Sequence, residues 1–188
     1  VAKRADIVIV MVPDTPHVEA VLFADKGVAA AYKAAGKEAT YGKIVVDMSS
    51  ISPIATKDFA ARINKTGAQY LDAPVSGGEV GAKAASLTIM VGGKADNLET
   101  VRPLLECLGK TITHIGDHGA GQVAKLCNQI AQVVNIEGIA EAMRFANAQG
   151  VDTGKVFQAM STGMAGSRML DMLGPKMVSS GFSVALSM

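Results

Sequence analysis

Three short apolar runs constrain the fold of this chain most, because a helical stretch follows each of them. The runs are residues 7–12 (IVIVMV), 43–48 (KIVVDM) and 68–75 (AQYLDAPV). Their nearly continuous apolar character is typical of strands that are covered on both faces, as in a parallel sheet. Strands that alternate with helices over short loops predict an α/β fold with a parallel sheet.

Pairs of turn residues predict where the first helices begin. Thr15 can cap a helix that has Pro16 at its first position and continues through VEAVLF. Ser52 and Pro53 open a second helix in the same way, and it extends to about residue 65. Helices at these positions complete two strand–helix repeats.

The rest of the chain predicts two more strands and then helices alone. The strands are expected at residues 86–93 and 110–116, around a helix at about 94–108, and their direction stays open. Residues 119–148 contain no Pro and keep the helical period, which predicts a single long helix. Two shorter helices are expected at residues 152–161 and 167–178.

Charge and composition argue against several classes of partner. The 18 basic and 17 acidic residues leave a net charge of +1, which gives no electrostatic case for nucleic acid or an anionic membrane. The apolar runs fall far short of the roughly 20 residues that span a bilayer, and no signal peptide is visible. Cys107 and Cys127 are isolated, so we expect a cytoplasmic protein without a disulfide framework.

The turn after the third apolar run, in the stretch DAPVSGGEVGA, has two interpretations. Ser76 and Glu79 have the S-x-x-E spacing of a capping box, in which each side chain covers an N–H group at the start of a helix. Gly77 and Gly78 also leave the backbone bare at a helix N-terminus, which suits a small carboxylate. The residues alone favour the cap, because the motif is common.

The long predicted helix carries a polar face made of one lysine and three amides. On a helical wheel, each of the three amides lies within about 60° of Lys125, opposite an apolar face. The amides are Asn128, Gln129 and Gln132. A solvated side is the ordinary explanation, and a ligand-orienting face is the alternative. The helix dipole and partial burial both predict a lowered pKa for Lys125, which suits proton transfer.

Two weaker signals concern histidines and carboxylates. His114 and His118 lie near each other without an evident third ligand, so we expect a strand-to-helix loop there and no metal site. Asp47 and Asp72 each end a predicted strand, and a structural role and a role in a site both stay open.

Several separate motifs resemble the β-hydroxyacid dehydrogenases. DAPVSGG is followed by LTIMVGG and then by GAGQVAKLCNQ, in the order and spacing of that family. The stretches MVPDTPHVEAVLF and VVDMSSISPIATK are most similar to the branch that reduces tartronate semialdehyde. The resemblance covers essentially the whole chain, and it favours the carboxylate interpretation of the glycine turn.

The resemblance implies a domain organisation. Residues 1–117 correspond to the C-terminal half of a Rossmann-type dinucleotide-binding domain, without its first strands and its G-x-G-x-x-G turn. Residues 118–188 correspond to a long connecting helix and the start of an all-helical domain. Ala85 stands where members of the family usually have Gly, so we expect an altered turn before Ser86.

The resemblance also assigns roles to nine residues. Lys125 corresponds to the catalytic lysine. Four positions correspond to the substrate-binding residues: Ser76, Gly77, Gly78 and Asn128. Four others correspond to contacts with NADH or NADPH: Val12, Pro13, Ser49 and Ser50.

The implied activity is reversible hydride transfer that converts tartronate semialdehyde to glycerate, in an enzyme expected to be a homo-oligomer. One alternative is an oxidoreductase of the 3-hydroxyisobutyrate dehydrogenase type, and another is a non-catalytic fragment that binds only a carboxylate. Because the pyrophosphate-binding turn is not among these residues, we expect the 188-residue chain by itself to bind NADH poorly and to show little turnover.

Overall fold

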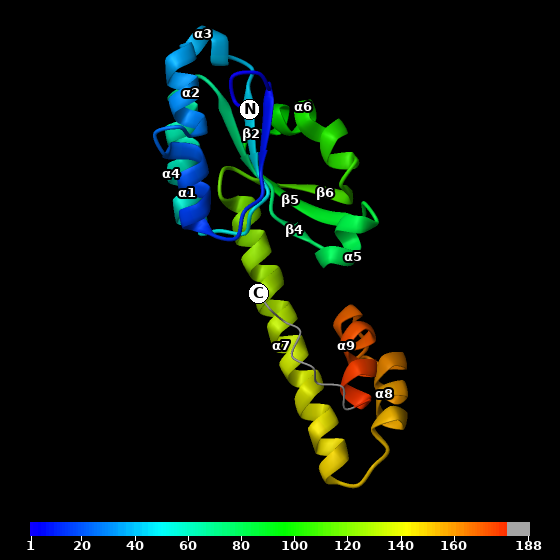
Figure 1. The fold of residues 1–188 in the computed structure, drawn as a ribbon. Helices are drawn as coiled ribbons and strands as arrows, with labels where there is room; N and C mark the ends of the chain where they lie inside the picture. The colour runs from blue at the N-terminus through cyan, green and yellow to red at the C-terminus, as the bar shows by residue number, and fades with distance from the viewer. Residues whose placement is uncertain (180–188) are drawn as a thin grey trace. The chain divides into compact units, whose positions relative to one another are not determined.

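The computed structural model describes residues 1–179, which fall into two compact units (Figure 1). The first unit is Val1–Leu126 and the second begins at Cys127. The first unit contains β1 (Ile7–Val10), α1 (Thr15–Phe23), α2 (Val28–Ala35), α3 (Lys37–Thr40), β2 (Ile44–Asp47), α4 (Pro53–Asn64), β3 (Gln69–Asp72), β4 (Val75–Ser76), α5 (Gly78–Lys83), β5 (Leu87–Gly92), α6 (Ala95–Glu106), β6 (Gly109–Gly116) and the start of α7 (Ala120–Ala148). The rest of α7, α8 (Thr153–Thr162) and α9 (Arg168–Val178) belong to the second.

The sheet of the first unit runs in two directions. Strands β1, β2 and β3 are parallel, whereas β5 is antiparallel to β3 and β4 and parallel to β6. The predicted α/β fold and the parallel pairing of its first three strands are confirmed, and the direction of β5, which the sequence left open, is antiparallel to β3. Residues 77–86 join β4 to β5, and this link is shorter than the dozen or more residues of a parallel crossover, so β5 returns antiparallel.

The predicted strand 68–75 is divided into β3 and β4 because the chain changes its partner strand there. The Ala73 N–H group still donates to Asp47 O at 2.7 Å, on the β2 side. Pro74 has no N–H group, and its carbonyl accepts the Met90 N–H group from β5 at 3.0 Å. The chain thus leaves β2 and joins β5 within two residues.

Alternate residues of the central strands build two cores on opposite faces of the sheet. Val45 and Tyr70 pack with α1, α2 and α4, whereas Val46 and Leu71 pack with α6. Figure 1 shows α1, α2 and α4 on one side of these strands and α6 on the other. This alternation follows from the period of two along a strand. It explains why these strands are apolar at almost every position.

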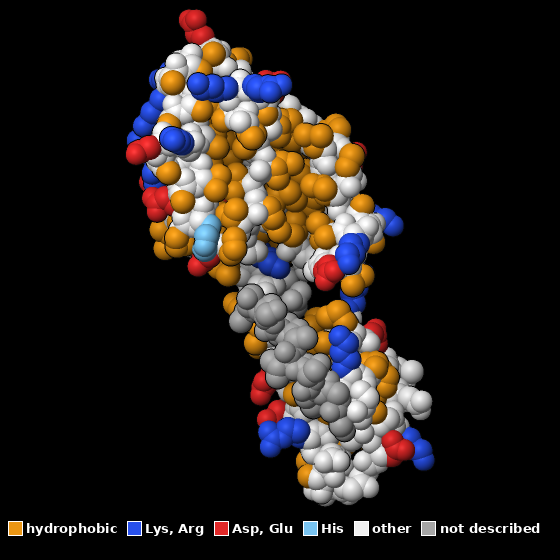
Figure 2. Space-filling view, viewed as in Figure 1, with side chains coloured by type: hydrophobic (Ala, Val, Ile, Leu, Met, Phe, Trp, Pro, Cys, Tyr) orange, Lys and Arg blue, Asp and Glu red, His pale blue; other side chains and the backbone are white. Residues whose placement is uncertain are grey.

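Strand β1 departs from the expected burial. Ile9 is 44% exposed and Met11 is 63% exposed, although Val8 and Val10 are buried. In the described sheet β1 is an edge strand with β2 as its neighbour, and Figure 2 shows hydrophobic side chains gathered on this side of the unit. The expectation that the run 7–12 is buried on both faces is therefore wrong: among the described residues 1–179, none covers the side chains of Ile9 and Met11 fully.

The helix starts agree with the sequence in part. Ser52 caps α4, because its hydroxyl accepts the Ala55 N–H group at 3.4 Å. The cap of α1 is Asp14 and not Thr15, since the Asp14 carboxylate accepts the Thr15 N–H group at 2.6 Å. The Thr15 hydroxyl instead accepts the Ser52 N–H group at 3.2 Å.

The second unit is helical, as expected. Ile139 and Met143 of α7 form its buried centre with Leu170 of α9, and side chains of α8 pack against them. Across residues 1–179, no helix is both long enough and apolar enough to cross a membrane.

The turn before Ser86 is a Schellman motif with an unusual residue. The Ser86 N–H group donates to Gly81 O at 2.9 Å, and the Ala85 N–H group donates to Ala82 O at 3.2 Å. This motif requires a left-handed residue, usually Gly, and Ala85 adopts φ 49° there. The backbone follows the turn at the cost of strain at Ala85.

We expect Ala85→Gly to raise the free energy of unfolding by about 0.5–1 kcal/mol, because Gly relieves the left-handed strain but gains entropy in the unfolded chain. Urea denaturation followed by circular dichroism measures the change. Ala84→Gly is the matched control, since Ala84 has φ −86° and gains nothing from Gly. A loss of stability in Ala85→Gly would contradict the assigned conformation.

Candidate active site

The predicted cofactor residues follow the carboxyl ends of β1 and β2, which are neighbouring parallel strands. The Val12 N–H group donates to Ser49 Oγ at 3.0 Å, so the two loops are joined directly. Ser49 is fully buried, and Pro13 and Ser50 are the adjacent residues. Ligands of open α/β sheets bind at this edge, outside the carboxyl ends of the strands.

Asp47 ends β2 and organises the loop that follows it. Its carboxylate accepts the Ser49 N–H group at 3.0 Å and the Tyr70 hydroxyl at 2.8 Å. Burial raises the pKa of the Asp47 carboxyl, while the bonds from Ser49 and Tyr70 favour its charged form. The structure therefore gives Asp47 a structural role beside residues 49–51, which contain the predicted cofactor residues Ser49 and Ser50 and are called the cofactor loop below.

Asp72 ends β3, directly beside Asp47 in the register of the sheet. Its carboxylate accepts the Gly119 N–H group at 2.8 Å and the Gln122 N–H group at 3.0 Å. Gly119 directly precedes α7 and Gln122 lies in its first turn, where the positive end of the helix dipole favours an anion. Burial raises the pKa of the Asp72 carboxyl, and the two backbone bonds oppose that rise.

Gln122 joins the cofactor loop to the same helix, and the sequence analysis missed it. Its Oε1 atom accepts the Ile51 N–H group at 3.1 Å, and its Nε2 group donates to Ser49 O at 2.7 Å. The residue is 1% exposed. The available signal was its place on the wheel, roughly 60° from Lys125 on the polar side of the helix.

Lys125 lies in the second turn of α7 and is half-buried. Burial lowers the pKa of its ammonium group, in the direction that the sequence predicts. Asn128 follows three residues later in α7 and belongs to the second unit. A half-buried lysine of lowered pKa is suited to donate a proton or to stabilise a developing oxyanion.

The capping-box interpretation of the glycine turn is wrong. Helix α5 begins at Gly78 with Gly77 as its N-cap and no side-chain cap, so Ser76 lies one residue too early, in β4. Gly77 and Gly78 have φ 139° and 59°, conformations that favour glycine. Glu79 forms an ion pair with Lys83 at 2.6 Å instead.

Two glycines allow α7 to begin very close to the sheet. A Cβ atom on Gly121 would lie 2.9 Å from Asp72 O and would also collide with Met90 O. A Cβ atom on Gly92 would lie 2.6 Å from Asp72 Oδ1 and 2.8 Å from Gly121 N. The bonds from α7 to Asp72 therefore depend on bare backbone at both positions.

The two histidines contact backbone carbonyls. His114 Nε2 lies 2.7 Å from Gly93 O, and His118 Nε2 lies 2.9 Å from Tyr70 O. Among the described residues, no three side chains of the metal-binding types come together. Both histidines thus stabilise the strand-to-helix region around α7.

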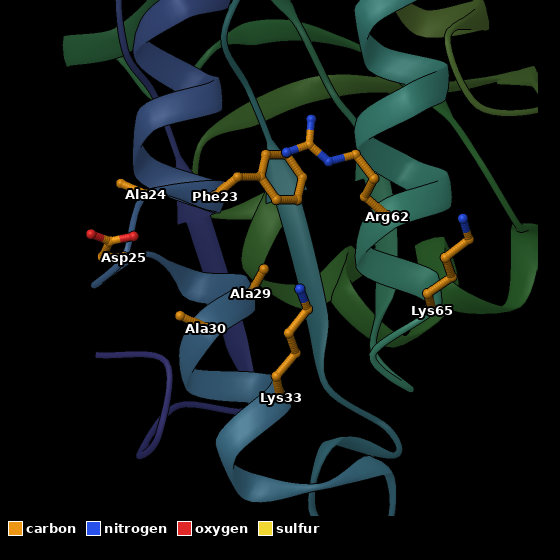
Figure 3. A pocket seen from close by; sticks show the side chains of 8 residues that line it. All are labelled: Phe23, Ala24, Asp25, Ala29, Ala30, Lys33, Arg62 and Lys65. Carbon is orange, nitrogen blue, oxygen red and sulfur yellow. The ribbon is translucent and has the colours of Figure 1, made fainter.

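A cavity of about 410 Å³ lies among α1, α2 and α4, and none of the predicted site residues lines it. Its lining consists of Phe23, Ala24, Asp25, Ala29, Ala30, Lys33, Arg62 and Lys65. Figure 3 shows the Arg62 guanidinium group stacked over the Phe23 ring, 3.5 Å from its centre. Arg62 also pairs with Glu19 and Asp58, each at 3.1 Å, so this cation is already paired within the protein and gives no reason to place the active site there.

Known protein families match both parts of the chain. Residues 1–116 match the family of the NAD-binding domain of 6-phosphogluconate dehydrogenase. Residues 119–187 match the NAD-binding family of NADP-dependent 3-hydroxyisobutyrate dehydrogenase. The 2-hydroxy-3-oxopropionate reductase of Escherichia coli (strain K12) is 48% identical over 190 residues, which cover 99% of this chain and 63% of that protein.

The chain belongs to the β-hydroxyacid dehydrogenase family. The NAD-binding families that it matches confirm the expected nicotinamide cofactor, NADH or NADPH.

Solved structures of the family have the same fold. The 3-hydroxyisobutyrate dehydrogenase of Mycobacterium tuberculosis with L-serine is 34% identical, with a TM-score of 0.81 over 93% of this chain and 56% of that one. Psf3 in complex with NADP+ and 2-OPP is 28% identical, with a TM-score of 0.83 over 95% of this chain and 61% of that one. The chain thus spans less than two thirds of each of these relatives.

We expect Gly121→Ala to lower the free energy of unfolding by about 1–3 kcal/mol, since its Cβ atom would push α7 away from Asp72. Gly138→Ala is the matched control in the same helix, because nothing lies within 4 Å of its Cβ position. That control is expected to raise stability by about 0.5–1 kcal/mol. Urea denaturation measures both changes, and equal stability of the two variants would contradict the close approach of α7.

Proposed function

We propose that the protein reduces tartronate semialdehyde (2-hydroxy-3-oxopropionate) reversibly to glycerate, with NADH or NADPH as the hydride donor. The observation that carries this proposal is the placement of Lys125. The helix that bears it is bonded to Asp72 and to the cofactor loop, and burial lowers the pKa of its ammonium group. The 48% identity to the Escherichia coli reductase supports this substrate.

The residues present fit the cofactor at the carboxyl ends of β1 and β2. Val12 and Ser49 are fixed there by their mutual hydrogen bond, and Pro13 and Ser50 lie next to them. When bound, the nicotinamide cofactor supplies the hydride. These four residues would hold it at the edge of the sheet where α7 begins.

Lys125 would act on the carbonyl oxygen of the aldehyde. Negative charge develops on that oxygen during reduction, so an ammonium group stabilises the charge and then delivers a proton. In the reverse direction, neutral Lys125 would accept the proton of the substrate hydroxyl. A lowered pKa makes this neutral form easier to reach than for an ordinary lysine.

The glycine turn would hold the carboxylate end of the substrate. Ser76 offers a hydroxyl group, and the backbone N–H groups of Gly77 and Gly78 suit the carboxylate that tartronate semialdehyde carries. Asn128, one turn after Lys125 in α7, is proposed as a substrate contact because it corresponds to the substrate-binding amide of the family. Binding of the carboxylate fixes the direction of the carbonyl group.

A second candidate is the reduction of methylmalonate semialdehyde, the reaction of a 3-hydroxyisobutyrate dehydrogenase. The similarity to the Mycobacterium tuberculosis enzyme favours it. Assays of the complete protein with both aldehydes and both cofactors separate the two candidates by kcat/KM. Calorimetry that finds carboxylate binding without NADH binding would support a non-catalytic binding role instead.

We expect Lys125→Ala to lower kcat in the complete protein by about 10²-fold or more, the scale of general acid–base catalysis. The control is Lys155→Ala, which removes an exposed lysine from α8 and leaves turnover unchanged. For the wild type, the rate of reduction is expected to fall as the pH rises through a pKa below that of an ordinary lysine, because only the ammonium form donates the proton. Retained turnover in Lys125→Ala would remove this residue from the mechanism.

We also propose that the protein is a homo-oligomer. The apolar face of α7 is exposed in the second unit, where Ile130 is 66%, Val133 61% and Val134 67% exposed. Apolar side chains gathered in this way favour burial against another surface.

If a second copy covers this face, Ile130→Glu is expected to convert the oligomer to monomers in sedimentation velocity. Met164→Glu is the control, because Met164 is exposed but lies outside α7. If Ile130→Glu keeps the molecular mass of the wild type but has a lower free energy of unfolding, another part of the same polypeptide covers this face, and a second copy does not.

A further inference from the structure

Gln122 is the side chain that connects the cofactor loop with the helix that carries Lys125. Both polar groups of its amide bond to one short segment. The oxygen accepts the Ile51 N–H group at 3.1 Å, and the NH₂ group donates to Ser49 O at 2.7 Å. Its own backbone N–H group donates to Asp72 Oδ2 at 3.0 Å. One residue therefore binds the loop after β2 and the end of β3 together.

The orientation of this amide is determined by its partners. A rotation of the amide by 180° would place Nε2 against the Ile51 N–H group and Oε1 against the Ser49 carbonyl, and both contacts would be repulsive. Because Gln122 is almost completely buried, water cannot replace the lost bonds. A loop displaced from this helix would leave these buried groups without partners.

The bonds continue to the residues of the proposed reaction. Ser49, whose carbonyl accepts from Gln122, also accepts the Val12 N–H group on its hydroxyl at 3.0 Å. Lys125 lies three residues after Gln122, less than one turn of α7. A shift of the Gln122 contact would thus move the cofactor residues relative to the lysine.

We propose that Gln122 is a positioning residue for the proposed reaction: its side chain locks residues 49–51 to the first turn of α7, so that the cofactor loop and Lys125 keep one arrangement. This inference rests on the proposed function for its chemical consequence. In this proposal Gln122 does not touch the substrate or the cofactor. It acts through Ser49 and through the helix that carries Lys125.

The test compares Gln122→Met with Thr40→Val in the complete protein. Met keeps the volume of Gln122 but loses both of its hydrogen bonds. Thr40 is also fully buried, and its hydroxyl donates to Thr66 O at 2.6 Å, before β2 and β3 begin. Both variants are expected to lower the free energy of unfolding, so the control accounts for a general loss of stability.

Two readouts distinguish positioning from a structural role alone. Gln122→Met is expected to raise the Kd for NADH tenfold or more and to move the pKa of Lys125, measured by NMR of its side chain, back toward that of an ordinary lysine. Thr40→Val is expected to change neither quantity. If both variants change these quantities alike, or if Gln122→Met changes neither, the positioning role is wrong.

A second variant keeps the test decisive if Gln122→Met does not fold. Gln122→Glu retains an acceptor for Ile51 N–H but donates to Ser49 O only when it is protonated. Binding of NAD+ to this variant is expected to strengthen as the pH falls, relative to the wild type, and the absence of that trend would overturn the proposal. The proposed function is tested separately by turnover of the wild type. The pKa of Lys125 and the Kd of the cofactor are measured without turnover, so they test the positioning role by itself.

Discussion

The rest of the site depends on the hydrogen bonds that the Asp72 carboxylate accepts from two N–H groups at the start of α7, those of Gly119 and Gln122. A buried carboxylate without partners is very costly, and unpaired N–H groups at a buried helix start are costly too. Here the N–H groups donate to the carboxylate, so both are satisfied, and the helix dipole further favours the negative charge at this position. This contact fixes where α7 begins relative to β3, and thereby fixes the position of Lys125 in the following turn.

Backbone without side chains makes that contact possible. Gly121 and Gly92 approach Asp72 so closely that a methyl group at either position would occupy the space of the hydrogen bonds. The loop after β2 then meets the same helix through Gln122. Three segments that are distant in sequence therefore share one rigid junction at the carboxyl edge of the sheet, where loops of α/β folds bind ligands.

Local patterns in the sequence predict the elements of this junction but not the contacts between them. The apolar runs and the uninterrupted helical period locate β2, β3 and α7, because those signals depend on neighbouring residues. The exposure of Ile9 was not predictable, since an apolar run shows what a strand can bury and not what covers it. Gln122 was missed because its partners Ser49 and Ile51 lie about seventy residues away. The direction of β5 depends on the length of one connection.

Lys125 is a residue that local stability does not favour. A cation in the second turn opposes the helix dipole, and partial burial of an ammonium group adds a further cost. An acidic residue would stabilise this end of α7, yet the first turn of the helix contains none. The anion is supplied instead by Asp72, at the end of β3. A helix whose start is stabilised from outside can tolerate a lysine near it, and breaks of local rules of this kind are expected where a residue serves chemistry.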